Sequence, residues 1–113
     1  MNASKKAELI AAIADDMKAE QIDTLDVREK TSIAEVFVLC TATNDRHMVA
    51  IADRIAEKLA EHKIKPLRTE GTNSGWVLQD FGDVVLHIMK EEQRQFYDLE
   101  TLWKTMQADP NLI

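Results

Sequence analysis

The feature that most constrains the fold is a nearly continuous apolar run between residues 34 and 42. The run is too short to cross a bilayer, which takes about 20 apolar residues in a helix. It is rich in β-branched residues and lies between polar segments, a pattern typical of a strand that is covered on both faces. We therefore expect a central strand here, in a sheet with helices packed against it.

Three segments have apolar residues at the spacing of amphipathic helices. The first covers about residues 4–19, with Ser4 as its expected N-cap. The second runs to about residue 62 and can be capped by Thr43 or Asn44, with Asp45 in its first turn. The third begins near Glu91. Its expected apolar stripe consists of Phe96, Leu99, Leu102, Trp103 and Met106.

Further segments predict strands on either side of the second helix. Residues 24–28 alternate between apolar and polar side chains, and a short polar turn should join them to 34–42 as a hairpin. Pro66 restricts 65–70 to a short or edge strand, because proline cannot donate to a ladder. Residues 76–81 and 84–89 flank Gly82-Asp83, a favourable hairpin turn. The predicted fold is a single domain, residues 1–113, of the mixed α/β class, with about five strands in a mixed sheet and three helices.

Charge narrows the classes of partner. The chain has 20 acidic and 14 basic side chains, a net charge of −6. Nucleic acid is disfavoured as a direct partner, because affinity for it comes from Lys and Arg that neutralise phosphates. A basic protein surface is favoured, because opposite charges speed encounter. The acidic residues that follow Glu8 are atypical of a signal peptide, so we expect a cytoplasmic protein without a membrane span.

The sequence contains none of the common catalytic motifs. A phosphate-binding GxxxxGK[ST], a zinc-binding HExxH and a GxSxG nucleophile elbow are all missing. Asp80 and Asp83 form the one carboxylate pair that could hold Mg²⁺. They also bracket a predicted turn, where aspartate commonly bonds its own backbone, and we favour that interpretation. We therefore expect no enzymatic activity, no metal and no cofactor.

Three further side chains could carry chemistry, and we expect a structural role for each. Cys40 lies within the apolar run, where a buried thiol is inert. His87 lies in the middle of a predicted strand, where a histidine is more often hydrogen-bonded and partly buried than catalytic. His47 lies in the first turn of a helix, which disfavours a positive charge.

Strand alternation places Trp76, Leu78 and Asp80 on one face of the sheet. Trp76 follows a Gly-rich loop and is either an interface anchor or a core residue under a helix. In the third helix, Phe96 is expected to lie in the core. Arg94 and Tyr97 lie three residues apart and are expected to share a surface, which makes them the better interface candidates.

The motifs together resemble one known family. The similar segments are 26–43, 46–47, 70–71, 75–78, 80–87, 94–100 and 102–103. They include Glu-Gly, Gly-Trp-Val-Leu, Asp-Phe-Gly-Asp-Val-Val-Leu-His and Arg-Gln-Phe-Tyr-Asp-Leu-Glu, and they span nearly the whole chain. In combination this pattern resembles the ribosomal silencing factor (Iojap-like) family.

The resemblance implies a nucleotidyltransferase-like topology without an active site. It also implies a translational repressor that binds large-subunit ribosomal protein number fourteen and sterically blocks joining of the small subunit. Some members of the family are homodimers when free. Two alternatives remain at this point: a metal-dependent nucleotidyltransferase-fold enzyme that uses Asp80 and Asp83, and a dimeric adaptor with another protein partner.

On this interpretation, the docking patch would include several of the side chains singled out above. The expected contact residues are Trp76, Leu78, Asp80, Arg94 and Tyr97. The expected sources of complementary negative charge are Asp83, Glu91 and Asp98.

Overall fold

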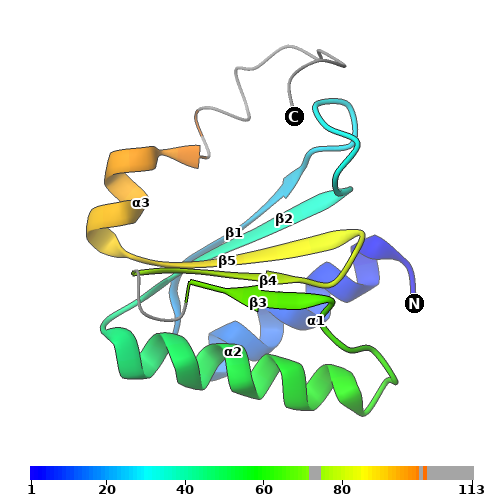
Figure 1. The fold of residues 1–113 in the computed structure, drawn as a ribbon, viewed down its shortest axis with the longest axis horizontal. Coiled ribbons are helices and arrows are strands. Elements are labelled where there is room, and N and C mark those ends of the chain that lie inside the picture. The colour runs from blue at the N-terminus through cyan, green and yellow to red at the C-terminus, as the bar shows by residue number, and fades with distance from the viewer. Residues whose placement is uncertain (72–74, 100, 102–113) are drawn as a thin grey trace.

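The computed structural model describes residues 1–71, 75–99 and 101. Within these residues, five strands form one sheet in the order β1-β2-β5-β4-β3 (Figure 1). The strands are β1 (Glu20–Asp26), β2 (Val36–Ala42), β3 (Arg68–Glu70), β4 (Trp76–Asp80) and β5 (Val84–Lys90). β2 and β5 are parallel, whereas the other neighbouring pairs are antiparallel. The structure confirms the predicted mixed sheet, both hairpins and the short edge strand.

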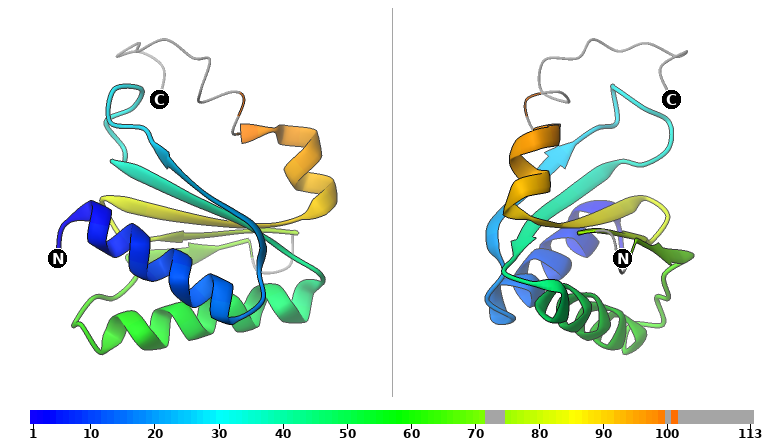
Figure 2. Two further views of the ribbon diagram at one scale, coloured as in Figure 1. Left: turned by 180° about the vertical axis from the view of Figure 1, so that it is seen from behind. Right: turned by 60° about the vertical axis from the view of Figure 1, so that its left-hand side comes forward.

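Helices lie on both sides of the sheet. α1 (Ala3–Asp16) and α2 (Asp45–Ala60) cover one face, and α3 (Glu91–Tyr97) lies over one end of the other (Figures 1 and 2). Among the described residues, no helix is long and apolar enough to cross a bilayer. The expected α/β class, with three helices against a five-stranded sheet, is confirmed.

The main core lies between the sheet and the two long helices. Ile10 of α1 and Ile51 and Ile55 of α2 are fully buried against Val38 and Leu86 of the two parallel strands. Burying a side chain of this size contributes about 1.5–3 kcal/mol. This layer explains why β2 and β5 are almost wholly apolar.

A smaller core lies on the face toward α3. Its fully or nearly buried members are Leu25, Val27, Ala34, Phe37, Leu39, Val85 and Met89. Trp76, Leu78 and Leu99 pack against it and are only partly buried. β2 is therefore buried on both faces, as the apolar run predicts. On the face toward α3, a tryptophan and two leucines thus stay partly exposed.

The N-cap of the first helix differs from the one expected, whereas that of the second is one of the two expected. Asn2, and not Ser4, caps α1, because its side-chain oxygen accepts a hydrogen bond of 2.9 Å from the backbone N–H of Lys5. Asn44 caps α2 by accepting from the backbone N–H of His47 at 2.8 Å. The choice between Thr43 and Asn44 is thus settled in favour of Asn44.

The expected apolar stripe of the third helix is wrong at Phe96. α3 ends at Tyr97, where Asp98 adopts a left-handed conformation with φ of 43°. A helical face therefore does not continue from Phe96 to Leu99, and the Phe96 side chain is 81% exposed. Leu99 contacts the smaller core in its place. The expected positions of Leu102, Trp103 and Met106 lie outside the described residues.

Candidate docking surface

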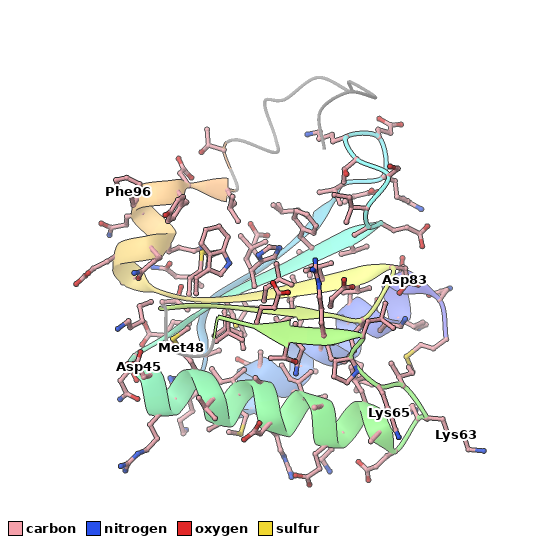
Figure 3. The ribbon with its side chains drawn as sticks, viewed as in Figure 1. Asp45, Met48, Lys63, Lys65, Asp83 and Phe96 are labelled. Atoms are coloured by element: carbon pink, nitrogen blue, oxygen red, sulfur yellow. The ribbon has the colours of Figure 1, made fainter. Side chains whose placement is uncertain are left out.

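A row of aromatic rings lies where β4 begins and α3 passes over the sheet. The Trp76 ring centroid is 4.8 Å from that of Tyr97, and the Tyr97 centroid is 5.0 Å from that of Phe96. On its other side, Trp76 contacts His87 of β5, with ring centroids 5.9 Å apart. Phe96 points away from the sheet at the far end of α3 (Figure 3). Tyr97 is 49% exposed, so the row ends at the surface with two exposed rings.

The backbone fixes this row by joining a strand directly to a helix. β5 ends at Lys90 and α3 begins at Glu91 without an intervening loop. The N–H of Lys90 also donates to the carbonyl of Gly75, at 3.0 Å, immediately before Trp76. Gly75 has a positive φ of 82°, and a Cβ there would lie 2.8 Å from Nε2 of Gln93. Glycine at this position therefore leaves room for the Gln93 side chain of α3 beside the start of β4.

Beside the rings lies a hollow of about 470 Å³, here called the aromatic hollow. Its lining residues are Trp76, Glu92, Gln93, Phe96 and Tyr97. Three of them are aromatic and one is an exposed carboxylate. The sequence analysis identified Trp76 and Tyr97 but missed the other three. The polar residues Glu92 and Gln93 at the start of the helix could be recognised in the sequence, whereas the end of the helix, which exposes Phe96, could not.

His87 contacts the buried side of Trp76 and holds its indole ring in place. The indole N–H of Trp76 donates to Nδ1 of His87 at 3.1 Å, so the neutral ring carries its hydrogen on Nε2. His87 is 5% exposed, and burial lowers its pKa to about 4. The predicted hydrogen-bonded, buried histidine is confirmed. Trp76 fits neither expected alternative alone, since it packs on the smaller core and also lines the aromatic hollow.

Arg94 does not share a surface with Tyr97, and that expectation is wrong. Its side chain is 6% exposed, and its Nη1 donates to the hydroxyl of Thr41 at 2.9 Å. The Thr41 hydroxyl donates in turn to Oε1 of Gln21 at 3.2 Å. The guanidinium thus reaches back under α3 and ties the helix to β2, which leaves Tyr97 as the exposed member of the pair.

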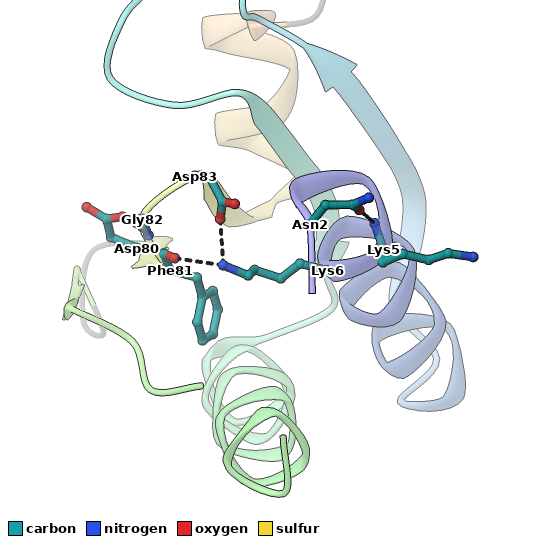
Figure 4. Close-up of polar contacts among 7 residues, drawn as sticks. All are labelled: Asn2, Lys5, Lys6, Asp80, Phe81, Gly82 and Asp83. Carbon is teal, nitrogen blue, oxygen red and sulfur yellow. Dashed lines mark hydrogen bonds and ion pairs between the residues drawn. The ribbon is translucent and has the colours of Figure 1, made fainter. Parts of the chain in front are cut away.

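Asp80 and Asp83 lie at the opposite end of the β4–β5 hairpin from the aromatic row (Figures 3 and 4). Oδ1 of Asp80 accepts from the backbone N–H of Gly82 at 2.8 Å, and its Oδ2 lies 3.5 Å from Nε of Arg68. Asp83 pairs with Nζ of Lys6 at 2.6 Å. The predicted turn chemistry is present at Asp80, whereas Asp83 pairs with a distant lysine, and cations contact both carboxylates. Within the described residues, no cluster of three His, Cys, Asp or Glu could hold a metal ion.

The other expected site residues lie closer to the aromatic row. Leu78 is half-buried on the same sheet face as Trp76. Glu91 and Asp98 lie at the two ends of α3. Oε1 of Glu91 accepts from the side chain of Gln95 at 2.8 Å, and Oδ1 of Asp98 accepts from the N–H of Thr101 at 3.4 Å. The structure therefore places Tyr97, Glu91 and Asp98 on α3 or at its end, away from the aspartates of the turn, although Glu91 faces Gln21 of β1, whose Nε2 lies 3.4 Å from its Oε1.

Comparisons with known proteins show which family the chain belongs to. A family profile described as "Ribosomal silencing factor during starvation" matches residues 1–112. This chain belongs to that family. A relative named ribosomal silencing factor in Bacillus subtilis is 36% identical over 91% of this chain and 88% of its own length. The chloroplastic Iojap protein of Arabidopsis thaliana is also 36% identical, over 83% of this chain and 40% of its own.

Solved structures of similar proteins share the fold of this family member. A crystal structure of a Chromobacterium violaceum protein, 31% identical, covers 100% of this chain and 95% of its own with a TM-score of 0.88. A Bacillus halodurans structure, 33% identical, covers 88% of this chain and 94% of its own with a TM-score of 0.76. The resemblance read from the sequence motifs is thus confirmed at the level of family and fold.

Proposed function

We propose that this family member represses translation by binding the large ribosomal subunit and keeping the small subunit from joining it. The contact on the large subunit is ribosomal protein number fourteen, as the family resemblance implies. Membership of the silencing factor family supports the ribosomal role. The net charge of −6 suits a basic ribosomal protein as the direct partner.

The observation that carries the proposal is the exposed aromatic row. Tyr and Trp are enriched among the residues that dominate binding energies, and here they lie together at the surface beside an exposed Phe96. α3, which carries two of the rings, lies on the sheet face that α1 and α2 leave open (Figure 2), and Trp76 packs on the smaller core of that face. Glu91, Glu92 and Asp98 supply negative charge along the same short helix. An apolar centre with a charged rim is the usual composition of a protein interface.

Steric occlusion requires no chemistry at this surface. A folded domain held on the subunit interface excludes the small subunit by its volume, so affinity and position determine repression. This agrees with the structure at Asp80 and Asp83, whose carboxylates are engaged by Arg68, Gly82 and Lys6. The proposed role therefore rests on the docking surface alone.

Sedimentation with isolated subunits tests the proposal. The purified protein is centrifuged with large or small subunits at low and moderate salt. We expect it to pellet with large subunits only, and less at moderate salt, because salt screens attraction between exposed charges. Added before the subunits are mixed, it should also reduce the assembled ribosome peak. Protein that stays in the supernatant at both salt concentrations would favour the adaptor role instead.

A further inference from the structure

The aromatic hollow combines flat apolar surfaces with hydrogen-bond acceptors. Its rings come from Trp76, Phe96 and Tyr97, and its polar side chains are Glu92 and Gln93. Among the described residues, no cation pairs with the carboxylate of Glu92. Oε1 of Gln93 is buried and likewise has no hydrogen-bond partner in the part of the chain that is described. A donor that enters the hollow and reaches this oxygen would therefore satisfy an acceptor that is otherwise unpaired among the described residues.

This composition selects for a planar cation with several donors. A guanidinium stacks on aromatic faces and donates several hydrogen bonds in its own plane, so it can contact ring and carboxylate together. An ammonium group is a compact, strongly hydrated charge and gains less from a flat apolar wall. A nucleotide base could also stack here, but its phosphate would approach Glu91 and Glu92. A purely apolar side chain would leave the acceptors without a donor.

We propose that the aromatic hollow binds an arginine side chain of the partner protein. The guanidinium stacks on the rings of Trp76 and Phe96 and pairs with the carboxylate of Glu92. The identity of the partner as a basic ribosomal protein rests on the proposed function, whereas the arginine specificity rests on the hollow itself. An experiment can therefore contradict the arginine specificity without contradicting the proposed function, or the proposed function without the arginine specificity.

A titration followed by NMR tests the hollow without the ribosome. The full-length, ¹⁵N-labelled protein is titrated with the capped tripeptide Gly-Arg-Gly. The matched ligands are Gly-citrulline-Gly, which has the same shape without the charge, and Gly-Lys-Gly. Affinities should lie in the millimolar range, because one side chain supplies few contacts. We expect saturable shifts of the α3 amides with the arginine peptide, binding weaker by roughly threefold or more with lysine, and none that saturates with citrulline.

Two single substitutions locate the contact. Glu92→Gln and Phe96→Leu should each weaken binding of the arginine peptide about fivefold, by removing the ion pair or the stacking surface. Glu29→Gln, at another exposed glutamate, and Leu67→Ala, at another exposed apolar side chain, are the matched controls and should change it less than about twofold. Equal binding of citrulline and arginine, or full retention by both hollow variants, would overturn the proposal.

Other occupants give distinct outcomes. Saturable α3 shifts with adenosine monophosphate would indicate a base-stacking site and would overturn arginine specificity. A dimer in light scattering that becomes a monomer with Phe96→Leu would assign the hollow to a second copy of the chain. If the protein pellets with large subunits but the arginine peptide does not bind, this proposal fails and the proposed function stands. If the peptide binds but the protein does not pellet with large subunits, the arginine site stands and the proposed function fails.

Discussion

At the turn of the β4–β5 hairpin, charged side chains have partners within the chain, whereas at the other end of the same strands aromatic side chains face solvent. At the turn end, Asp80 pairs with Arg68 and the backbone of Gly82, and Asp83 pairs with Lys6. The open end holds Trp76 and the exposed rings of α3. Polar groups that are hydrogen-bonded to one another stabilise a fold, while a cluster of exposed aromatic rings, unlike a single exposed side chain, marks a surface that can gain by binding. We therefore expect the turn end to contribute mainly to stability and the open end mainly to binding.

The largest expected effect concerns His87, which supports the open end. Its pKa is lowered to about 4 in the folded protein, against an ordinary value of about 6.5. The unfolded chain therefore binds more protons between these values, and stability should fall as the pH falls from 6.5 to 4. The full shift corresponds to roughly 3 kcal/mol of unfolding free energy.

Urea unfolding at several pH values measures this effect. His87→Gln keeps an acceptor for the indole N–H of Trp76 but does not titrate, so its stability should depend less on pH over that window. His62→Gln, at an exposed histidine, is the matched control and should behave like the unchanged protein. Identical pH dependence for His87→Gln and the unchanged protein would refute the assignment.

The second effect is loss of stability at the turn end. Lys6→Ala leaves the Asp83 carboxylate without its cation and removes a donor to the Phe81 carbonyl, at 3.3 Å (Figure 4). Removing one partner of a fully buried pair costs 3–5 kcal/mol, and because Asp83 stays 30% exposed we expect about 2 kcal/mol here. Denaturant titration measures it. Lys5→Ala, beside it but exposed, should cost less than about 0.5 kcal/mol.

The third effect is loss of ribosome binding at the open end. Trp76→Ala or Tyr97→Ala should weaken pelleting with large subunits by about 2 kcal/mol, or roughly thirtyfold, if the rings anchor the interface. Leu67→Ala is the control, because that side chain is 74% exposed and lies at the turn end beside Gly82. A folded Trp76 or Tyr97 variant that pellets as well as the Leu67 variant would exclude that residue from the patch.

The smallest effect separates two glycines with similar backbone angles. Gly75 and Gly82 have φ of 82° and 92°, so alanine should cost about 1 kcal/mol at either from backbone strain. At Gly82 an added Cβ would lie 4.0 Å from Cδ1 of Leu67, an ordinary contact, whereas at Gly75 it would lie 2.8 Å from Nε2 of Gln93, the far end of a flexible side chain. Only Gly75→Ala should therefore also shift the Gln93 side chain, which lines the aromatic hollow, and weaken ribosome binding slightly. Equal binding by both variants would exclude the Gln93 side chain from the docking surface.

The sheet could be predicted from the sequence because its pattern is local. Alternation along 76–80 placed Trp76, Leu78 and Asp80 on one face, and Gly82-Asp83 marked the turn. The resemblance of the motifs also gave the family before the structure was known. These features depend on neighbouring residues and on side-chain direction, both of which the sequence shows directly.

The site was harder to predict, because it depends on where one short helix ends and on contacts between distant residues. The left-handed Asp98 ends α3 and exposes Phe96, although the residue spacing suggests a longer helix. Arg94 is buried because Thr41, 53 residues earlier in the chain, lies within its reach. The spacing of apolar residues within one segment does not show which residues of distant segments its side chains will contact.

The direct junction of β5 and α3 has a consequence for how fast the surface can bind and release. A helix that continues from the middle strand of the sheet is held in place before any partner arrives. Little conformational entropy is then lost on docking, and encounter needs no folding step. Differences in residence time on the ribosome should therefore arise from the contacts of individual side chains in the dissociation rate. Under the proposed function, substitutions in the aromatic hollow would change how long repression lasts more than how soon it begins.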